Sequence, residues 1–155
     1  LLIDSRADIQ ARKKDGATAL MLASEYGQAA YTKVLVDAKA DIDVKDESGR
    51  TALMLAARNG YSSCVELLVN SKADLECRNS RSGRTALMFA AGGGHAACVE
   101  LLANAKAGLN VHDVNEGQTA LMVAAAGGNT ECVRVLIQAR LKIEADGELE
   151  TNESQ

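Results

Sequence analysis

The sequence predicts an all-α protein built as a solenoid of stacked helix–turn–helix units. The tetrapeptide TALM occurs four times, beginning at Thr18, Thr51, Thr85 and Thr119, so the period is 33 or 34 residues. A glycine lies two residues before each threonine and another lies nine residues after it. Self-similarity at such a period is typical of repeat proteins, in which each unit packs only on its neighbours.

The segment after each threonine is predicted to be a short helix. Thr is a favourable N-cap because its hydroxyl can accept a hydrogen bond from a free amide of the first turn. The run ALMLAARNG at 52–60 is apolar and ends in Gly60, which suits a left-handed residue that ends a helix. We expect the methionines to fill space between units, and a ligand groove or copper site is the alternative. These methionines are Met21, Met54, Met88 and Met122.

A second helix is predicted in each unit, followed by a protruding loop. SSCVELLVNS at 62–71 has apolar residues on one side only, and Ser63 with Glu66 could form a capping box. The polar stretch KADLECRNSRSGR at 72–84 reads as a turn. The one-residue insertions that lengthen the third and fourth units fall in NSRSG and DVNEG, at loop tips, where insertions are tolerated.

The repeated unit resembles the ankyrin repeat. Residues 46–61 read DESGRTALMLAARNGY and residues 65–74 read VELLVNSKAD, against a family pattern of D-x-x-G-x-T-P-L-H-x-A-A-x-x-G-H and V-x-x-L-L-x-x-G-A-D. The resemblance implies an ankyrin-repeat solenoid with β-hairpin-like loops. Its expected divisions are the tail of a truncated repeat at 1–12, repeats at 13–45, 46–78, 79–112 and 113–146, and an acidic tail at 147–155.

The chain departs from the family pattern at the end of the second helix, where the family has Gly. We expect the same left-handed turn here, although a side chain in that conformation costs on the order of 1 kcal/mol. A cation at a helix C-terminus recovers about 0.3–1 kcal/mol through the helix dipole. The residues at this position are Arg6, Lys39, Lys72, Lys106 and Arg140.

The two ends of the sequence differ from the middle. LLIDSRADIQAR at 1–12 aligns with VLVDAKADIDVK at 34–45, so we expect the chain to begin inside a repeat and to be a piece of a longer protein. The last stretch, EADGELETNESQ, loses the period and is acidic, which favours disorder near 147–155.

Bulk charge and hydropathy argue against two kinds of partner. The 155 residues carry a net charge of −4, so the chain has no overall basic field for nucleic acid. No apolar run approaches the roughly 18 residues that a membrane span requires. We therefore expect no nucleic-acid partner and no insertion into a membrane.

No cluster of residues has the pattern of a catalytic or metal site. Cys64, Cys98 and Cys132 recur in one register, and we expect them to be small buried hydrophobes in a reducing compartment. His112 lies beside Asp113, but no Ser or Cys nucleophile is placed with them. We expect no enzymatic activity, no cofactor and no metal.

The resemblance implies that partners bind the loop tips and the exposed ends of the first helices, which line a concave face. Arginines concentrate in the middle of this face, which favours an acidic peptide segment as the partner. A merely solvated loop face is the alternative. The candidate binding residues are Lys14, Asp15, Glu25, Tyr26, Glu47, Arg50, Arg58, Asn59, Arg81, Arg84, Asn115, Glu116 and Gln118. The same register adds the small residues Ala17, Ser48, Ser82, Gly92, Gly93, Ala126 and Gly127.

The function expected from these features is a non-catalytic protein–protein interaction module. The alternative is a regulatory or targeting segment of a larger protein that carries a catalytic domain, for example a protein kinase. We expect a monomer located in the cytoplasm, with the nucleus as an alternative location.

Overall fold

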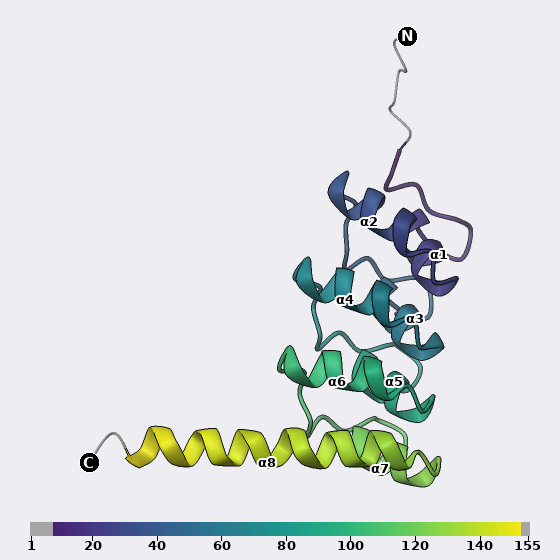
Figure 1. Ribbon diagram of the computed structural model, residues 1–155. Coiled ribbons are helices and arrows are strands. Elements are labelled where there is room, and N and C mark those ends of the chain that lie inside the picture. The colour runs from purple at the N-terminus through teal and green to yellow at the C-terminus, as the bar shows by residue number, and fades with distance from the viewer. Residues whose placement is uncertain (1–7, 153–155) are drawn as a thin grey trace.

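The computed structural model describes residues 8–152 and, for side chains, residues 8–147. Figure 1 shows helix pairs stacked one above another, each joined to the next by a loop. First helices pack on first helices and second helices on second helices, so the predicted all-α solenoid is confirmed. The helices are α1 (Ala19–Glu25), α2 (Ala29–Asp37), α3 (Ala52–Asn59), α4 (Ser62–Asn70), α5 (Ala86–Gly92), α6 (Ala96–Asn104), α7 (Ala120–Ala126) and α8 (Thr130–Asn152).

The first helices begin at the TALM threonines, as predicted. The hydroxyl of Thr18 accepts from the amide of Met21 at 3.3 Å, and Thr51 and Thr119 do the same in their own repeats. Thr85 occupies the N-cap position of α5 without this bond, and its hydroxyl is buried with no partner among the described residues. Three of the four predicted caps are therefore complete.

The predicted capping box at the start of α4 is wrong. The N-cap residue is Tyr61, and no side chain forms a capping hydrogen bond there. Ser63 lies within the first turn of the helix, two residues after the cap, so its hydroxyl is not placed to accept from the third amide. The chain instead turns tightly from α3 into α4 through Gly60, whose φ of 77° is left-handed.

The left-handed turn predicted after each second helix is present in three repeats. Lys39, Lys72 and Lys106 have φ of 65°, 66° and 68°. Arg6 lies outside the described residues. Arg140 contradicts the prediction, because it lies inside α8, which continues to Asn152.

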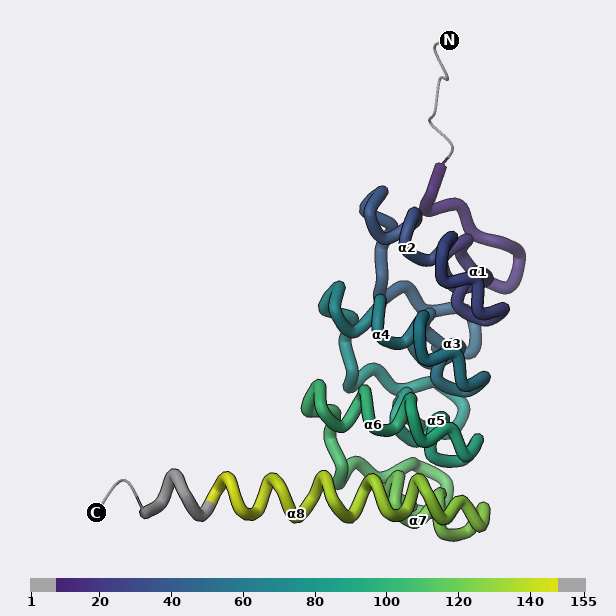
Figure 2. Tube along the Cα trace, viewed as in Figure 1, coloured from purple at the N-terminus to yellow at the C-terminus, as the bar shows by residue number. Residues whose placement is uncertain are grey.

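Helix α8 is much longer than the other second helices and runs across the expected boundary at 146 to Asn152. The division of the chain into repeats and an acidic tail stays a prediction, and residues 153–155 lie outside the described part of the chain. Figure 2 shows this helix leaving the stack at one end. It reaches well past the second helices of the other three repeats.

The core is a continuous layer of small and aliphatic side chains between successive repeats. Met21, Met54 and Met88 are 1%, 2% and 1% exposed, which confirms their predicted packing role. Met122, in the same register of the last repeat, is 53% exposed. Within the described residues, the packing role therefore applies to a methionine that a following repeat covers.

The loops are hairpin-like, as expected from the resemblance. In each loop an amide before the tip bonds to a carbonyl after it, and an amide of the next loop bonds to a carbonyl of this one. The bonds between neighbouring loops are Glu47 N to Asp15 O at 3.1 Å, Ser80 N to Ser48 O at 2.9 Å and Val114 N to Ser82 O at 2.9 Å. Main-chain hydrogen bonds thus fix the spacing of the loop tips.

Candidate functional site: the concave face

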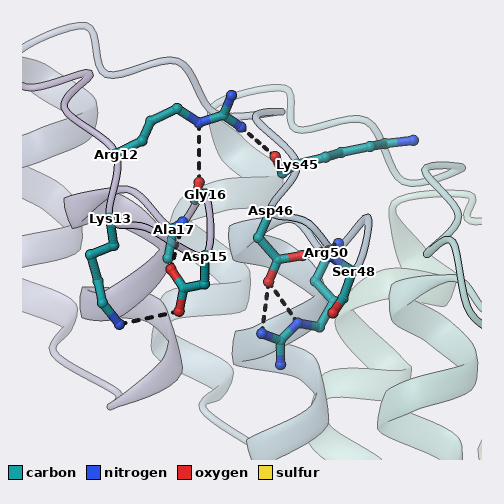
Figure 3. A network of polar contacts seen from close by, with 9 residues as sticks. All are labelled: Arg12, Lys13, Asp15, Gly16, Ala17, Lys45, Asp46, Ser48 and Arg50. Carbon is teal, nitrogen blue, oxygen red and sulfur yellow. Dashed lines mark hydrogen bonds and ion pairs between the residues drawn. The ribbon is translucent and has the colours of Figure 1, made fainter.

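Basic side chains at equivalent positions connect each loop to the loop of the following repeat. Arg12 donates from Nε to Gly16 O at 3.1 Å and from Nη2 to the carbonyl oxygen of Lys45 (Figure 3). Lys45 Nζ lies 3.4 Å from Arg78 O, and Arg78 donates to the carbonyl of His112. Each cation thus reaches the equivalent residue of the following repeat and holds the two loops together.

The second loop is organised by the buried carboxylate of Asp46. Its Oδ1 accepts from the amides of Ser48 and Arg50, each at 2.9 Å. Its Oδ2 lies 2.7 Å from both Nε and Nη2 of Arg50, a pair drawn in Figure 3. Charge-assisted bonds of this kind are among the stronger ones, so the Arg50 side chain is held against its own loop.

The third loop has an amide where the second has a carboxylate. Asn79 Oδ1 accepts from the amide of Arg84 at 2.8 Å but offers no charge to its guanidinium. Arg84 instead reaches the fourth repeat, where Nε lies 3.2 Å from Asp113 Oδ2 and Nη2 lies 3.4 Å from Gln118 Oε1. The change from Asp to Asn thus converts a bond within one loop into a bond between two repeats.

The buried carboxylate of Asp113 organises the fourth loop. The amides of Glu116 and Gln118 donate to its Oδ1 at 3.0 and 3.1 Å, and Arg84 binds its Oδ2. These hydrogen bonds, the amide of Glu116 foremost, lower the pKa of Asp113 below its ordinary value. The amide of Ala17 and the ammonium of Lys13 lower the pKa of Asp15 in the same way.

A hollow of about 480 Å³ lies between the second and third loop tips and the first helices α3 and α5. It gathers four of the predicted binding residues, Arg50, Arg58, Arg81 and Arg84, and no carboxylate is among its lining residues. The lining also includes Ser48, Asn79, Ser82, Met88, Phe89, Gly92 and Gly93.

The other candidate residues lie outside this hollow. Asn59 ties repeats together, since its Nδ2 donates to Glu25 O at 3.2 Å and to Leu55 O at 3.0 Å. Tyr26 is 66% exposed. Apart from Glu25, the last residue of α1, the remaining candidates lie in the first, second and fourth loops, and none of them lines the hollow. These remaining residues are Lys14, Asp15, Glu25, Glu47, Asn115, Glu116 and Gln118.

Phe89 was missed by the sequence reasoning as part of this surface. It is half-buried on α5 and lines the hollow, in the register held by Leu22, Leu55 and Val123 in the other repeats. The signal was available, because Phe89 is the only phenylalanine in the chain and replaces an aliphatic residue at that position. Asn79 and Met88 were missed as well.

The recurring cysteines and the pair His112 and Asp113 are the other titratable groups that the sequence analysis considered. Cys64, Cys98 and Cys132 are buried free thiols, as predicted, and burial raises the pKa of Cys98 to about 11. The Asp113 oxygens are occupied by amides and Arg84, so that carboxylate does not orient His112. Among the described residues, no group of His, Cys, Asp and Glu could hold a metal ion. Within the same range, no helix is long and apolar enough to cross a bilayer.

Comparison with known families decides the classification. The family described as Ankyrin repeats (3 copies) matches residues 1–79 and 72–147. The chain belongs to the ankyrin-repeat family. A comparison with curated proteins finds no match.

Membership of the ankyrin-repeat family accounts for the arrangement of this face. Ankyrin-repeat domains are in general protein–protein interaction modules and are typically non-catalytic. The variable loop and helix-end positions stand on a framework that the repeat fixes. The arginine hollow is therefore formed by residues particular to this chain on a framework common to the family.

Proposed function

We propose that this domain binds a partner protein through its loop tips and the exposed ends of its first helices, centred on the arginine hollow. The supporting observation is the hollow itself, where residues of two loops and two helices converge without any lining carboxylate. The lining mixes guanidinium groups with Phe89, a combination common at protein interfaces. An acidic segment of the partner suits the positive lining.

Site-specific photo-crosslinking tests this proposal. A benzophenone side chain is placed at Ser48 or Asn115, both exposed at loop tips, and as a matched control at Glu66 or Glu100, both exposed on second helices. The expected result is one partner captured from both loop-tip positions and from neither control position. Capture from the second helices alone would rule out the concave face as the binding surface.

A second proposal is that the array regulates or targets a larger protein with a catalytic domain such as a protein kinase. The same concave face would serve it, with the partner being either an external protein or that domain. Sequencing the complete reading frame tests it, and a frame that encodes only ankyrin repeats would contradict it.

The expected location and oligomeric state also stand as proposals. Four unpaired thiols within the described chain suit the cytoplasm or nucleus, and imaging of a fluorescent fusion checks this. A monomer is expected because partner binding uses the side of the stack rather than its ends. Analytical ultracentrifugation at micromolar concentration gives the mass directly.

A further inference from the structure

The four arginines of the hollow are not equivalent. Arg50 is paired with Asp46, and Arg84 is paired with Asp113, at 2.7 and 3.2 Å. Asp46 and Asp113 have side chains only 2% and 0% exposed, so both pairs are built into the framework of the loops. A guanidinium held in this way has less freedom to turn toward a ligand.

Arg58 and Arg81, by contrast, are exposed arginines outside these ion pairs. Among the side chains that the structure describes, neither forms an ion pair. Arg58 lies in the last turn of α3, and Arg81 lies at the tip of the third loop, within the stretch that carries the one-residue insertion. The two free cations therefore enter the hollow from different elements.

The floor of the hollow is open because the third repeat has glycines where the second has long side chains. Gly92 and Gly93 occupy the registers of Arg58 and Asn59. A Cβ on Gly93 would lie 2.5 Å from the His95 ring, whose Nε2 lies 3.0 Å from Arg58 O. A side chain at residue 93 would therefore displace the His95 ring, and neither Gly92 nor Gly93 has a side chain that could cover Phe89.

We infer that this hollow binds an extended acidic peptide through a division of roles. An apolar side chain of the peptide rests on Phe89, and its neighbouring anionic groups are held by Arg58 and Arg81. Arg50 and Arg84 position the loops and bind the ligand little. This inference rests on the proposed function and specifies its partner.

A peptide fits these observations better than a nucleic acid does. Two uncommitted arginines offer two positive charges, whereas the whole chain carries a net charge of −4 that repels a long polyanion. The single half-buried ring of Phe89 accommodates one side chain rather than a row of stacked bases. Two adjacent carboxylates or one phosphoryl group would match the charge of the arginine pair.

NMR titration of the whole chain tests the inference directly, because Phe89 is the only phenylalanine and its ring signals are unambiguous. The probe is a 12-residue peptide with Asp-Leu-Glu at its centre. Three further peptides carry lysines in place of the acids, serine in place of the leucine, or phosphoserine in place of the glutamate. The acidic leucine peptide is expected to shift the Phe89 ring, and the lysine peptide is expected not to.

Two charge-matched double variants separate specific binding from general electrostatics. The double variant Arg58→Ala, Arg81→Ala is expected to lower the affinity for the acidic peptide about tenfold, because two exposed ion pairs with the peptide are lost. Lys33→Ala with Arg134→Ala removes the same charge from second helices and is expected to change affinity by less than about twofold. An equal loss of peptide affinity in the two double variants would overturn the inference.

Phe89→Leu tests the apolar contact with little risk to folding, because Leu55 holds the same register in the second repeat. It is expected to reduce the preference for the leucine peptide over the serine peptide. Comparing the affinity of the phosphoserine peptide with that of the Asp-Leu-Glu peptide shows whether the arginines prefer a phosphoryl group or paired carboxylates. Binding of a 12-nucleotide single strand at Phe89 with equal affinity would overturn the assignment to a peptide.

The outcome also separates this inference from the broader function. If crosslinking captures a partner at the loop tips but loss of Arg58 and Arg81 leaves that capture unchanged, the interaction role stands and the acidic ligand is wrong. If no loop-tip position captures a partner and no peptide shifts Phe89, both proposals are wrong.

Discussion

At the residue scale, the concave face depends on which carboxylates hold which arginines. Asp46 binds Arg50 of its own loop, whereas Asp113 binds Arg84 of the preceding repeat. The local sequence predicted that the arginines would gather, since their registers place them on one face. It could not predict the second pairing, because that depends on Asn79 being uncharged and on a residue in another repeat.

Asp113 gives the first residue-scale prediction. Its folded pKa is lowered, so it contributes stability above the unfolded value of about 3.9, and this contribution is lost as pH falls through the folded pKa. Asp113→Asn keeps an acceptor for the loop amides, as Asn79 does. The variant is expected to be less stable than the parent at pH 7, with the difference shrinking below about pH 4.

Urea unfolding followed by circular dichroism at pH 2.5, 4 and 7 measures this difference. Glu66→Gln, on the exposed surface of α4, serves as the control with the same change of charge. A difference between parent and Asp113→Asn that stays constant from pH 7 to pH 2.5 would contradict the assigned role of the charge.

Cys77 gives a second residue-scale prediction. Burial first, and then the neighbouring Asp74 carboxylate 3.5 Å from its Sγ, raise the pKa of this thiol to about 11. Asp74→Asn removes the nearby negative charge and is expected to lower the pKa of Cys77 and speed its alkylation. Iodoacetamide labelling at pH 8 with mass spectrometry measures the rate at Cys77, and Cys98 on α6 is the internal control, expected to be unchanged.

At the scale of single elements, the helices follow the sequence period because each one buries one face. The three left-handed lysines followed from the same register argument, although the family has Gly there. The departure at Arg140 has a steric reason. Ala40, Ala73 and Ala107 follow the left-handed lysines and are 6%, 7% and 5% exposed, so the turn needs a small residue next.

Leu141 stands where those alanines stand and is too large for that buried position. Continuing the helix leaves Leu141 59% exposed, which avoids overpacking the site. The residues that follow, Lys142-Ile143-Glu144-Ala145, include good helix formers. The repeat period therefore predicts a turn that side-chain volume prevents, and volume in a packed site is not visible in periodicity.

The left-handed lysines give a prediction for the second helices. Lys72→Gly removes a side chain from a residue with φ of 66°. Relief of about 1–2 kcal/mol of strain opposes about 0.4–1 kcal/mol from a more flexible unfolded chain and about 0.3–1 kcal/mol from the lost interaction of the cation with the helix dipole. The variant is expected to be more stable by up to about 1 kcal/mol in guanidinium unfolding.

The opposite substitution provides the control. Gly27 has φ of 68°, and an added Cβ would lie 2.6 Å from the Tyr61 ring. Gly27→Ala therefore combines strain with a clash between repeats and is expected to destabilise by more than Lys72→Gly stabilises. A loss of stability in Lys72→Gly would show that the lysine makes a compensating contact.

At the scale of the whole molecule, stability comes from repeats covering one another in sequence. The four TALM methionines form a natural series, because the residue and its register are the same in every repeat. Met21, Met54 and Met88 are covered by a following repeat and are 1%, 2% and 1% exposed, whereas Met122, which no further repeat of the described residues covers, is 53% exposed. The exposure of each methionine thus reports whether its repeat has a neighbour on that side.

Substitution of these methionines measures the contribution of stacking. Met54→Ala and Met88→Ala each remove a fully buried side chain and are expected to cost about 2–5 kcal/mol. Met122→Ala is expected to change stability by less than about 0.5 kcal/mol, because most of its surface already contacts water. Guanidinium unfolding of each variant gives the free energies. Equal costs at Met88 and Met122 would mean that the methionine packs mainly within its own repeat, and that the stack is held by other contacts.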